Sequence, residues 1–177
     1  MVGAFYGLAP LYASRIGLPT QMIGLFMATC IVAGLLEQGP LGWLSDRLER
    51  PTLIRVASAL LMLVALPQAI FTDLPIIFIF VGGCLSCMLL FSLYPLAVAF
   101  ANDNIEAEKR VSLTAVLLTT FGIGASISPL LIGVLMKSFG PNMLYVSLSL
   151  FAMLIVIRVR PQAISGDTLS DEAPLQH

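Results

Sequence analysis

The chain has 177 residues, of which 58% are hydrophobic and only 11% are charged, and its mean hydropathy is +0.97. A water-soluble domain carries roughly 25% charged residues, so this composition argues against one. The net charge is −1 and no long basic run is present, which argues against nucleic acid as a partner.

Six apolar stretches are separated by short polar or charged links. A hydrocarbon core of ~30 Å requires ~20 apolar residues per helix. The sequence therefore predicts an all-α membrane protein, with five full transmembrane helices and one partial one in residues 1–160. These helices are expected at about residues 1–14, 21–44, 53–71, 76–101, 111–136 and 143–157. Residues 161–177 are polar and are expected to form a disordered tail.

The first stretch holds about 14 apolar residues, which are too few to span a bilayer. It runs directly into a polar link at residues 15–21, as the end of a spanning helix would. The simplest interpretation is that the chain begins inside a helix and is a fragment. A re-entrant or interfacial segment is the alternative.

Basic residues in the links predict the orientation, because cytoplasmic links of membrane proteins carry an excess of Lys and Arg. The links after the second, fourth and sixth helices hold Arg47, Arg50, Arg55, Lys109, Arg110, Arg158 and Arg160. The other links hold only Arg15 and Lys137. We therefore expect a multi-pass protein of the bacterial inner (plasma) membrane, with the first set of links and the carboxyl tail in the cytoplasm.

Proline lies inside four of the apolar stretches, at Pro10, Pro67, Pro95 and Pro129. Membrane helices tolerate proline because neighbouring groups bond the freed carbonyls. These residues permit bends, and transporters use bent helices around a central site.

The link after the second stretch combines a small residue with three charges, Gly42-x-x-x-Asp46-Arg47-x-x-Arg50. This pattern resembles the loop signature of the major facilitator superfamily, which follows the second helix of each six-helix half. Glu49 and Pro51 replace a glycine and a base of the usual pattern. Such departures are typical of the weaker copy in the carboxyl-terminal half. The resemblance implies that residues 1–160 correspond to helices seven to twelve, with the seventh truncated, and that an amino-terminal half is the partner.

Physical roles for this loop follow from its residue types. Gly42 removes a side chain where two helices approach closely. Asp46 ends its helix at the membrane surface and can accept bonds from free N–H groups of another helix. Arg47 and Arg50 can reach lipid phosphates or carboxylates. The resemblance implies a conformational latch between the two halves; the alternative is a charged turn that only sets topology.

Glu37 and Gln38 are unusual because they lie inside an apolar run. Glu37 precedes Asp46 by nine residues, which is ~13 Å along a helix. An ionised carboxylate at that depth costs at least ~2.5 kcal/mol unless it is paired or hydrated, so the protonated form is favoured. We expect Glu37 to exchange a proton during transport or to pair with a cationic substrate. The alternative is a neutral side chain bonded to Gln38 or to a neighbouring helix.

Aromatic residues at helical spacing predict a cavity wall. Phe91 and Tyr94 lie on one face of the fourth helix, and Tyr6 lies in the partial first helix. The resemblance implies that the first and fourth helices of a half line the cavity. Ordinary helix packing is the alternative interpretation of these aromatic residues.

Small residues in the fifth stretch, at Gly122, Gly124, Ser128, Pro129 and Gly133, predict a smooth face for close helix packing. The pattern is similar to a Gly-Pro signature of drug/proton antiporters in the same family. Ser128 stands where that signature has glycine, so we infer packing and not antiport.

No catalytic, metal or cofactor site is expected. The three cysteines, Cys30, Cys84 and Cys87, lie in apolar runs and are interpreted as small hydrophobic residues. The one histidine is His177, and no acidic pair is available for catalysis inside the membrane.

The sequence thus favours a secondary transporter that moves an unidentified small molecule by alternating access, coupled to an ion gradient such as that of protons. No phosphate-binding loop for ATP is present. Membrane lipids are the other expected partner. One alternative stays open, a small self-associating membrane protein that forms a pore or scaffold. A membrane-embedded enzyme is not expected, because the residues that it would need are absent from the apolar stretches.

Overall fold

The computed structural model describes residues 1–71, 74–103 and 105–159. Within them the chain is helical and no strand occurs, which confirms the predicted all-α fold. The elements in order are α1 (Val2–Arg15), α2 (Thr20–Ser45), α3 (Arg50–Ile70), α4 (Ile76–Asp103), a short 3-10 turn η1 (Ala107–Lys109), α5 (Arg110–Phe139) and α6 (Met143–Arg158). The tail predicted at residues 161–177 lies outside the described residues.

Helix ends follow local chemistry. Pro19 precedes α2, and Pro51 lies in the first turn of α3, where the missing N–H costs nothing. Gly140 ends α5 with φ +107°, a conformation that favours glycine. Helix α5 therefore runs three residues beyond its predicted end at residue 136.

In the described residues four helices, α2 to α5, are long and apolar enough to cross a membrane, with 26, 21, 28 and 30 residues. Helix α6 is apolar but has 16 residues, about 24 Å at 1.5 Å per residue. It stops at Arg158, so the last helix, which was predicted to cross the membrane fully, is shorter than the hydrocarbon core. Helix α1 has 14 residues, as expected for the partial helix.

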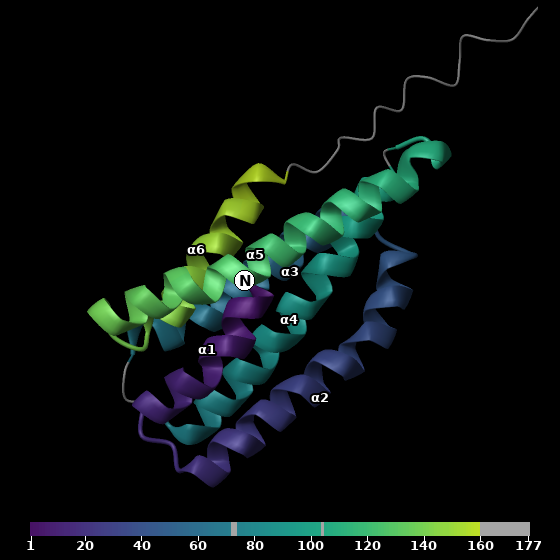
Figure 1. The fold of residues 1–177 in the computed structure, drawn as a ribbon. Coiled ribbons are helices and arrows are strands. Elements are labelled where there is room, and N and C mark those ends of the chain that lie inside the picture. Colours follow the sequence, from purple (N-terminus) through teal and green to yellow (C-terminus); the bar gives the residue numbers. More distant parts are fainter. Residues whose placement is uncertain (72–73, 104, 160–177) are drawn as a thin grey trace, which may run out of the picture.

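The helices pack in a pattern that repeats after every third helix (Figure 1). Helix α1 packs on α5, α2 packs on α4, and α3 packs on both α6 and α4. If α1, α2 and α3 are matched with α4, α5 and α6 in that order, the contact of α1 with α5 corresponds to the contact of α4 with α2. The contact of α3 with α6 corresponds to itself. The chain therefore consists of two related three-helix units, an arrangement found in transporters.

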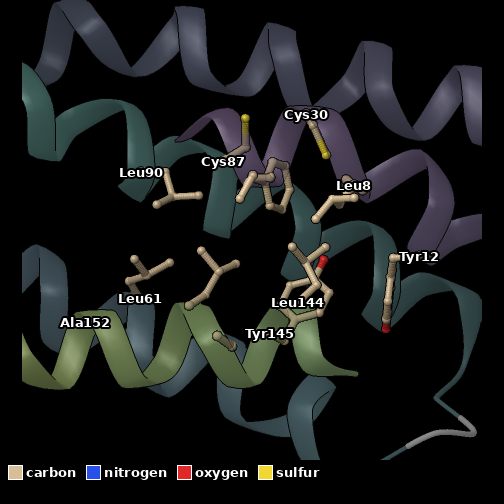
Figure 2. Close-up of a cluster of buried hydrophobic side chains, with 14 of the residues drawn as sticks. Leu8, Tyr12, Cys30, Leu61, Cys87, Leu90, Leu144, Tyr145 and Ala152 are labelled. Carbon is tan, nitrogen blue, oxygen red and sulfur yellow. The ribbon is translucent and has the colours of Figure 1, made fainter. Parts of the chain in front are cut away.

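Aromatic and aliphatic side chains fill the centre of the bundle (Figure 2). The Tyr145 ring of α6 meets Tyr12 and Phe5 of α1 edge to face, at centroid distances of 4.9 and 6.5 Å. Such pairs contribute about 0.5–1.5 kcal/mol beyond the area they bury. Figure 2 shows Cys30 and Cys87 on the opposite side of this cluster from α6. The core thus joins α6 to α1, α2 and α4.

Helices α2 and α5 contribute least to this core. In their most apolar windows only 17% of α2 and 6% of α5 are buried, compared with 44% of α4. The two are equivalent positions in the three-helix units. A large part of each surface is therefore left for lipid or for another polypeptide.

Candidate functional site

Glu37 lies on the side of α2 that faces α4. Its side chain is half-buried, and the Oε2 atom is buried without a hydrogen-bond partner. Across the contact, the Ser92 hydroxyl is within hydrogen-bonding reach of the carboxyl. Ser92 is 1% exposed, and its hydroxyl donates to the Leu89 carbonyl at 2.7 Å. Rotation of the Ser92 side chain would direct this hydrogen to Glu37 instead.

Among the described residues, Glu37 is the only Asp or Glu more than one turn from a helix end. The ion pairs found elsewhere among these residues, Arg50–Asp103 and Lys109–Glu106, lie at helix ends or in a link. The polar side chain within reach of Glu37 is thus Ser92 of the neighbouring helix α4. Gln38 is exposed and lines a groove of about 370 Å³ between α2 and α4.

The groove lies where α2 contains Pro40, a fifth proline inside a helix. Its lining is Gln38, Gly42, Ser45, Pro95, Leu96 and Ala99. Proline removes one helical hydrogen bond and bends the helix, and α2 curves along its length (Figure 1). The groove extends from Ser45, at the charged loop, to Gln38.

Tyr6 and Phe91 lie together one turn away from Glu37 along α2. Their rings meet edge to face with centroids 5.5 Å apart, and the Tyr6 hydroxyl lies 3.5 Å from the Cys87 Sγ. A Cβ atom at Gly34 would be 2.6 Å from the Phe91 Cδ2, so glycine allows this ring to lie directly on α2. The structure therefore places Tyr6, Phe91 and Glu37 in one region, between α1, α2 and α4.

Tyr94 occupies a different place. Its ring packs on Phe121 of α5 at a centroid distance of 4.4 Å. Both residues line a second, mainly apolar hollow of about 350 Å³ between α4, α5 and the start of α1, which Thr120 and Gly124 also border. The three aromatic residues predicted to line one cavity are thus divided between two regions.

The three cysteines converge between α2 and α4 and form no disulfide. Cys30 and Cys87 are buried, and the Cys84 thiol is within hydrogen-bonding reach of Cys30. In the part of the chain that the structure describes, no group of three His, Cys, Asp or Glu residues is arranged to hold a metal ion.

The two arginines of the charged loop have different surroundings. Arg47 lies over the Trp43 ring, 4.1 Å from its centroid, and Trp43 is 58% exposed. Arg50 pairs with Asp103 at the end of α4 and donates to the Ala99 carbonyl at 2.9 Å. Arg50 is therefore held by this chain, whereas Arg47 remains at the surface.

Gly42 and Asp46 both lie at the surface, near the end of α2. Nothing lies within 4 Å of the position of a Cβ atom at Gly42, and Asp46 is exposed at the end of α2. The close helix approach that we expect at Gly42 is not made within this half, and the latch role stays a prediction.

The small residues of α5 also divide into two groups. A Cβ atom added at Gly7 of α1 would lie 3.6 Å from Pro129, and one added at Gly133 would lie 3.7 Å from Leu8 of α1. Pro129 and Gly133 therefore lie where α1 packs on α5. The Ser128 hydroxyl is buried without a partner. Nothing lies within 4 Å of the Cβ positions of Gly122 and Gly124. Side chains at those two positions would therefore meet open space in the described residues.

The sequence interpretation did not single out Ser92, Asp103, Trp43 or Pro40. Trp43 could have been found, because it lies four residues before Arg47 on the same helix face. Ser92 and Asp103 could not, because their roles depend on which helices pair in space.

Comparison with known proteins now places the chain in a family. The model of the Major Facilitator Superfamily matches residues 1–175. The chain is also 32% identical over 164 residues to the uncharacterized MFS-type transporter YcaD of Escherichia coli O139:H28 (strain E24377A / ETEC), a match that covers 89% of this chain and 41% of the relative. The YcaD proteins of Escherichia coli O9:H4 (strain HS) and of strain K12 / DH10B match to the same extent.

The chain belongs to the major facilitator superfamily and is a multi-pass integral membrane protein. This confirms the resemblance seen in the charged loop. The chain spans less than half the length of the curated relatives it matches.

Proposed function

We propose that this chain forms the carboxyl-terminal half of a secondary transporter that moves a small molecule across the bacterial inner membrane, with Glu37 as the proton-coupling residue. The observation that carries the proposal is the half-buried Glu37 carboxyl, whose Oε2 has no partner at the α2–α4 contact. A carboxylate among apolar helices is stable only with a proton, a cation or water beside it. Gain and loss of that proton can therefore be linked to a change in the helices around it.

Alternating access requires a second half against which this one rocks. The exposed surfaces of α2 and α5 support such a partner, because both helices are little buried and carry glycines with open space, Gly42 in α2 and Gly122 and Gly124 in α5. Small residues allow close helix approach. In this proposal the amino-terminal half covers both surfaces, and the loop at Asp46 and Arg47 latches the halves in one state. The loop and the carboxyl tail lie in the cytoplasm.

The test uses proteoliposomes with a trapped pH-sensitive dye. They contain the chain alone, or the chain co-expressed with the part of the E. coli relative that it does not match. Addition of solutes from a panel should move protons in a saturable manner in the arm that contains both parts. The Glu37→Gln variant should abolish this movement, while Glu106→Gln, an exposed acid in the α4–α5 link, should leave it unchanged.

Proton movement that is identical in the Glu37→Gln variant would contradict the coupling role. A leak that rises linearly with solute concentration in both arms would favour the pore or scaffold alternative over alternating access.

A further inference from the structure

The groups around Glu37 favour a positively charged ligand at this position. The described part of the chain places no Lys or Arg in an ion pair with Glu37. Its neighbours are the Ser92 hydroxyl and, from the same helix α4, the Cys87 thiol. An anionic solute at this position would leave two negative charges without a counter-charge in a low-dielectric region, whereas a cation would complete the site.

Next to the carboxyl is an aromatic surface that suits a cation with an apolar body. The Tyr6 and Phe91 rings meet edge to face at 5.5 Å, and Phe91 lies on Gly34, three residues before Glu37. Aromatic faces attract organic cations by about 0.5–2 kcal/mol, more when water is excluded. Neither ring is fully buried, so each retains surface for a ligand.

We propose that Glu37, Tyr6 and Phe91 form a subsite for a monovalent organic cation, such as a hydrophobic amine or a quaternary onium ion. This inference rests on the proposed transport function and names its substrate class. A groove of about 370 Å³ lies between Gln38, the residue next to Glu37, and Ser45 at the charged loop. Its lining adds an amide and a hydroxyl but no charge.

The Glu37 carboxyl can hold a proton or pair with the cation, but not both at once. When the cation enters, the proton leaves Glu37 for water and the carboxylate pairs with the cation, so charge at the site is balanced without a covalent step. The titratable groups that face Glu37 are Cys87 from α4 and, through its contact with Cys87, Tyr6 from α1. Neither carries a charge that would substitute for the cation. Binding should therefore release up to one proton and weaken as the pH falls.

Two ions of similar size and opposite charge provide the test, tetraphenylphosphonium and tetraphenylborate. The purified full chain in detergent should bind tetraphenylphosphonium saturably and release protons as it does so. Glu37→Gln should weaken this binding about tenfold or more and remove the proton release, and Phe91→Leu should weaken it to a smaller extent. The control Glu106→Gln removes an exposed acid in the α4–α5 link and should bind as the unchanged chain does. Tetraphenylborate should not bind saturably.

Equal binding of tetraphenylphosphonium by the unchanged chain and by folded Glu37→Gln would overturn the inference, as would saturable binding of tetraphenylborate at the same site. Helical content and gel filtration establish that the variant is folded. If Glu37→Gln does not fold, Ser92→Ala and Glu37→Asp keep the inference testable, because each should weaken cation binding, and unchanged binding in both would refute it.

Failure of the cation subsite and failure of the proposed transport function would give different results. Saturable cation binding without proton-driven uptake would support the subsite and contradict the transport proposal. Glu37-dependent uptake of an uncharged or anionic solute, without binding of the cation, would support transport and contradict the subsite.

Discussion

The guanidinium of Arg50, at the first residue of α3, pairs with the carboxylate of Asp103, the last residue of α4. It also donates to the Ala99 carbonyl, close to the carboxyl end of α4. A cation at a helix carboxyl end is favoured by the helix dipole. The charged loop is thereby fastened to its own half through Arg50, while Arg47 beside Trp43 is left at the surface.

Replacing Arg50 by Ala should lower stability more than replacing Asp103 by Asn. The first change removes the ion pair and the bond to Ala99, whereas the second removes only the charge. Side-chain exposure of the pair is 27% and 55%, so each loss should be small, about 1 kcal/mol or less. That corresponds to about 2–4 °C in a chain of this size. Thermal unfolding of the purified chain in detergent measures it, and equal midpoints for the two variants would contradict the double role of Arg50.

The fold could be predicted from sequence because the bilayer imposes it. Apolar runs of ~20 residues and charged links are the direct consequence of a ~30 Å hydrocarbon core. Helix bounds were less predictable, since they depend on local backbone chemistry such as Gly140 at the end of α5. Glu37 was identifiable by itself as a charge in an apolar run. Its neighbour Ser92 was not, because nothing local to either residue shows that α2 packs on α4. Tyr94 illustrates the same limit, since its spacing from Phe91 did not reveal that it packs on α5.

Gly83 provides a test of how α2 packs on α4. A Cβ there would lie 2.3 Å from the Phe26 ring, which is fully buried. Gly83→Ala should therefore destabilise the chain by about 1–3 kcal/mol, because overpacking forces buried side chains to move. The matched control is Gly122→Ala in α5, where nothing lies within 4 Å. The control should be neutral or stabilising by up to about 1 kcal/mol, because Ala is the better helix former. Comparable destabilisation by both changes would show that the packing is described wrongly.

The cysteines should differ in reactivity toward a small maleimide. Cys30 and Cys87 are 0% and 1% exposed, whereas Cys84 is partly exposed. Cys84 should be modified first in the folded chain, and all three should react after denaturation. Mass spectrometry of the digested protein gives the order. Tyr6→Phe, which removes the hydroxyl next to Cys87, should raise the rate at Cys87 at most modestly, because burial and not this contact limits access. A folded chain in which Cys30 reacts first would contradict the arrangement.

Trp43 is the single tryptophan of the chain, so its fluorescence reports one position. Tryptophan prefers the membrane–water interface, and Trp43 is exposed next to Arg47 at the end of α2. In proteoliposomes, lipids brominated near the headgroup should quench Trp43 more strongly than lipids brominated near the chain end. Arg47→Ala should shift the emission, because the cation over the ring is lost. Quenching that is strongest at the bilayer centre would contradict the interfacial placement.

The proposed latch requires the charged loop to lie on the cytoplasmic side of the membrane. Two exposed positions at opposite ends of the bundle test this. Leu48 lies in the charged loop, and Ser138 lies in the last turn of α5. The excess of Lys and Arg predicts that Leu48 is cytoplasmic and Ser138 is on the outer side. In intact cells a membrane-impermeant maleimide should label Ser138→Cys and spare Leu48→Cys, and lysis should expose both. The chain without either substitution gives the background from its own cysteines. Labelling of Leu48→Cys in intact cells would reverse the topology, and the loop at Asp46 and Arg47 would then be unable to meet a cytoplasmic partner surface.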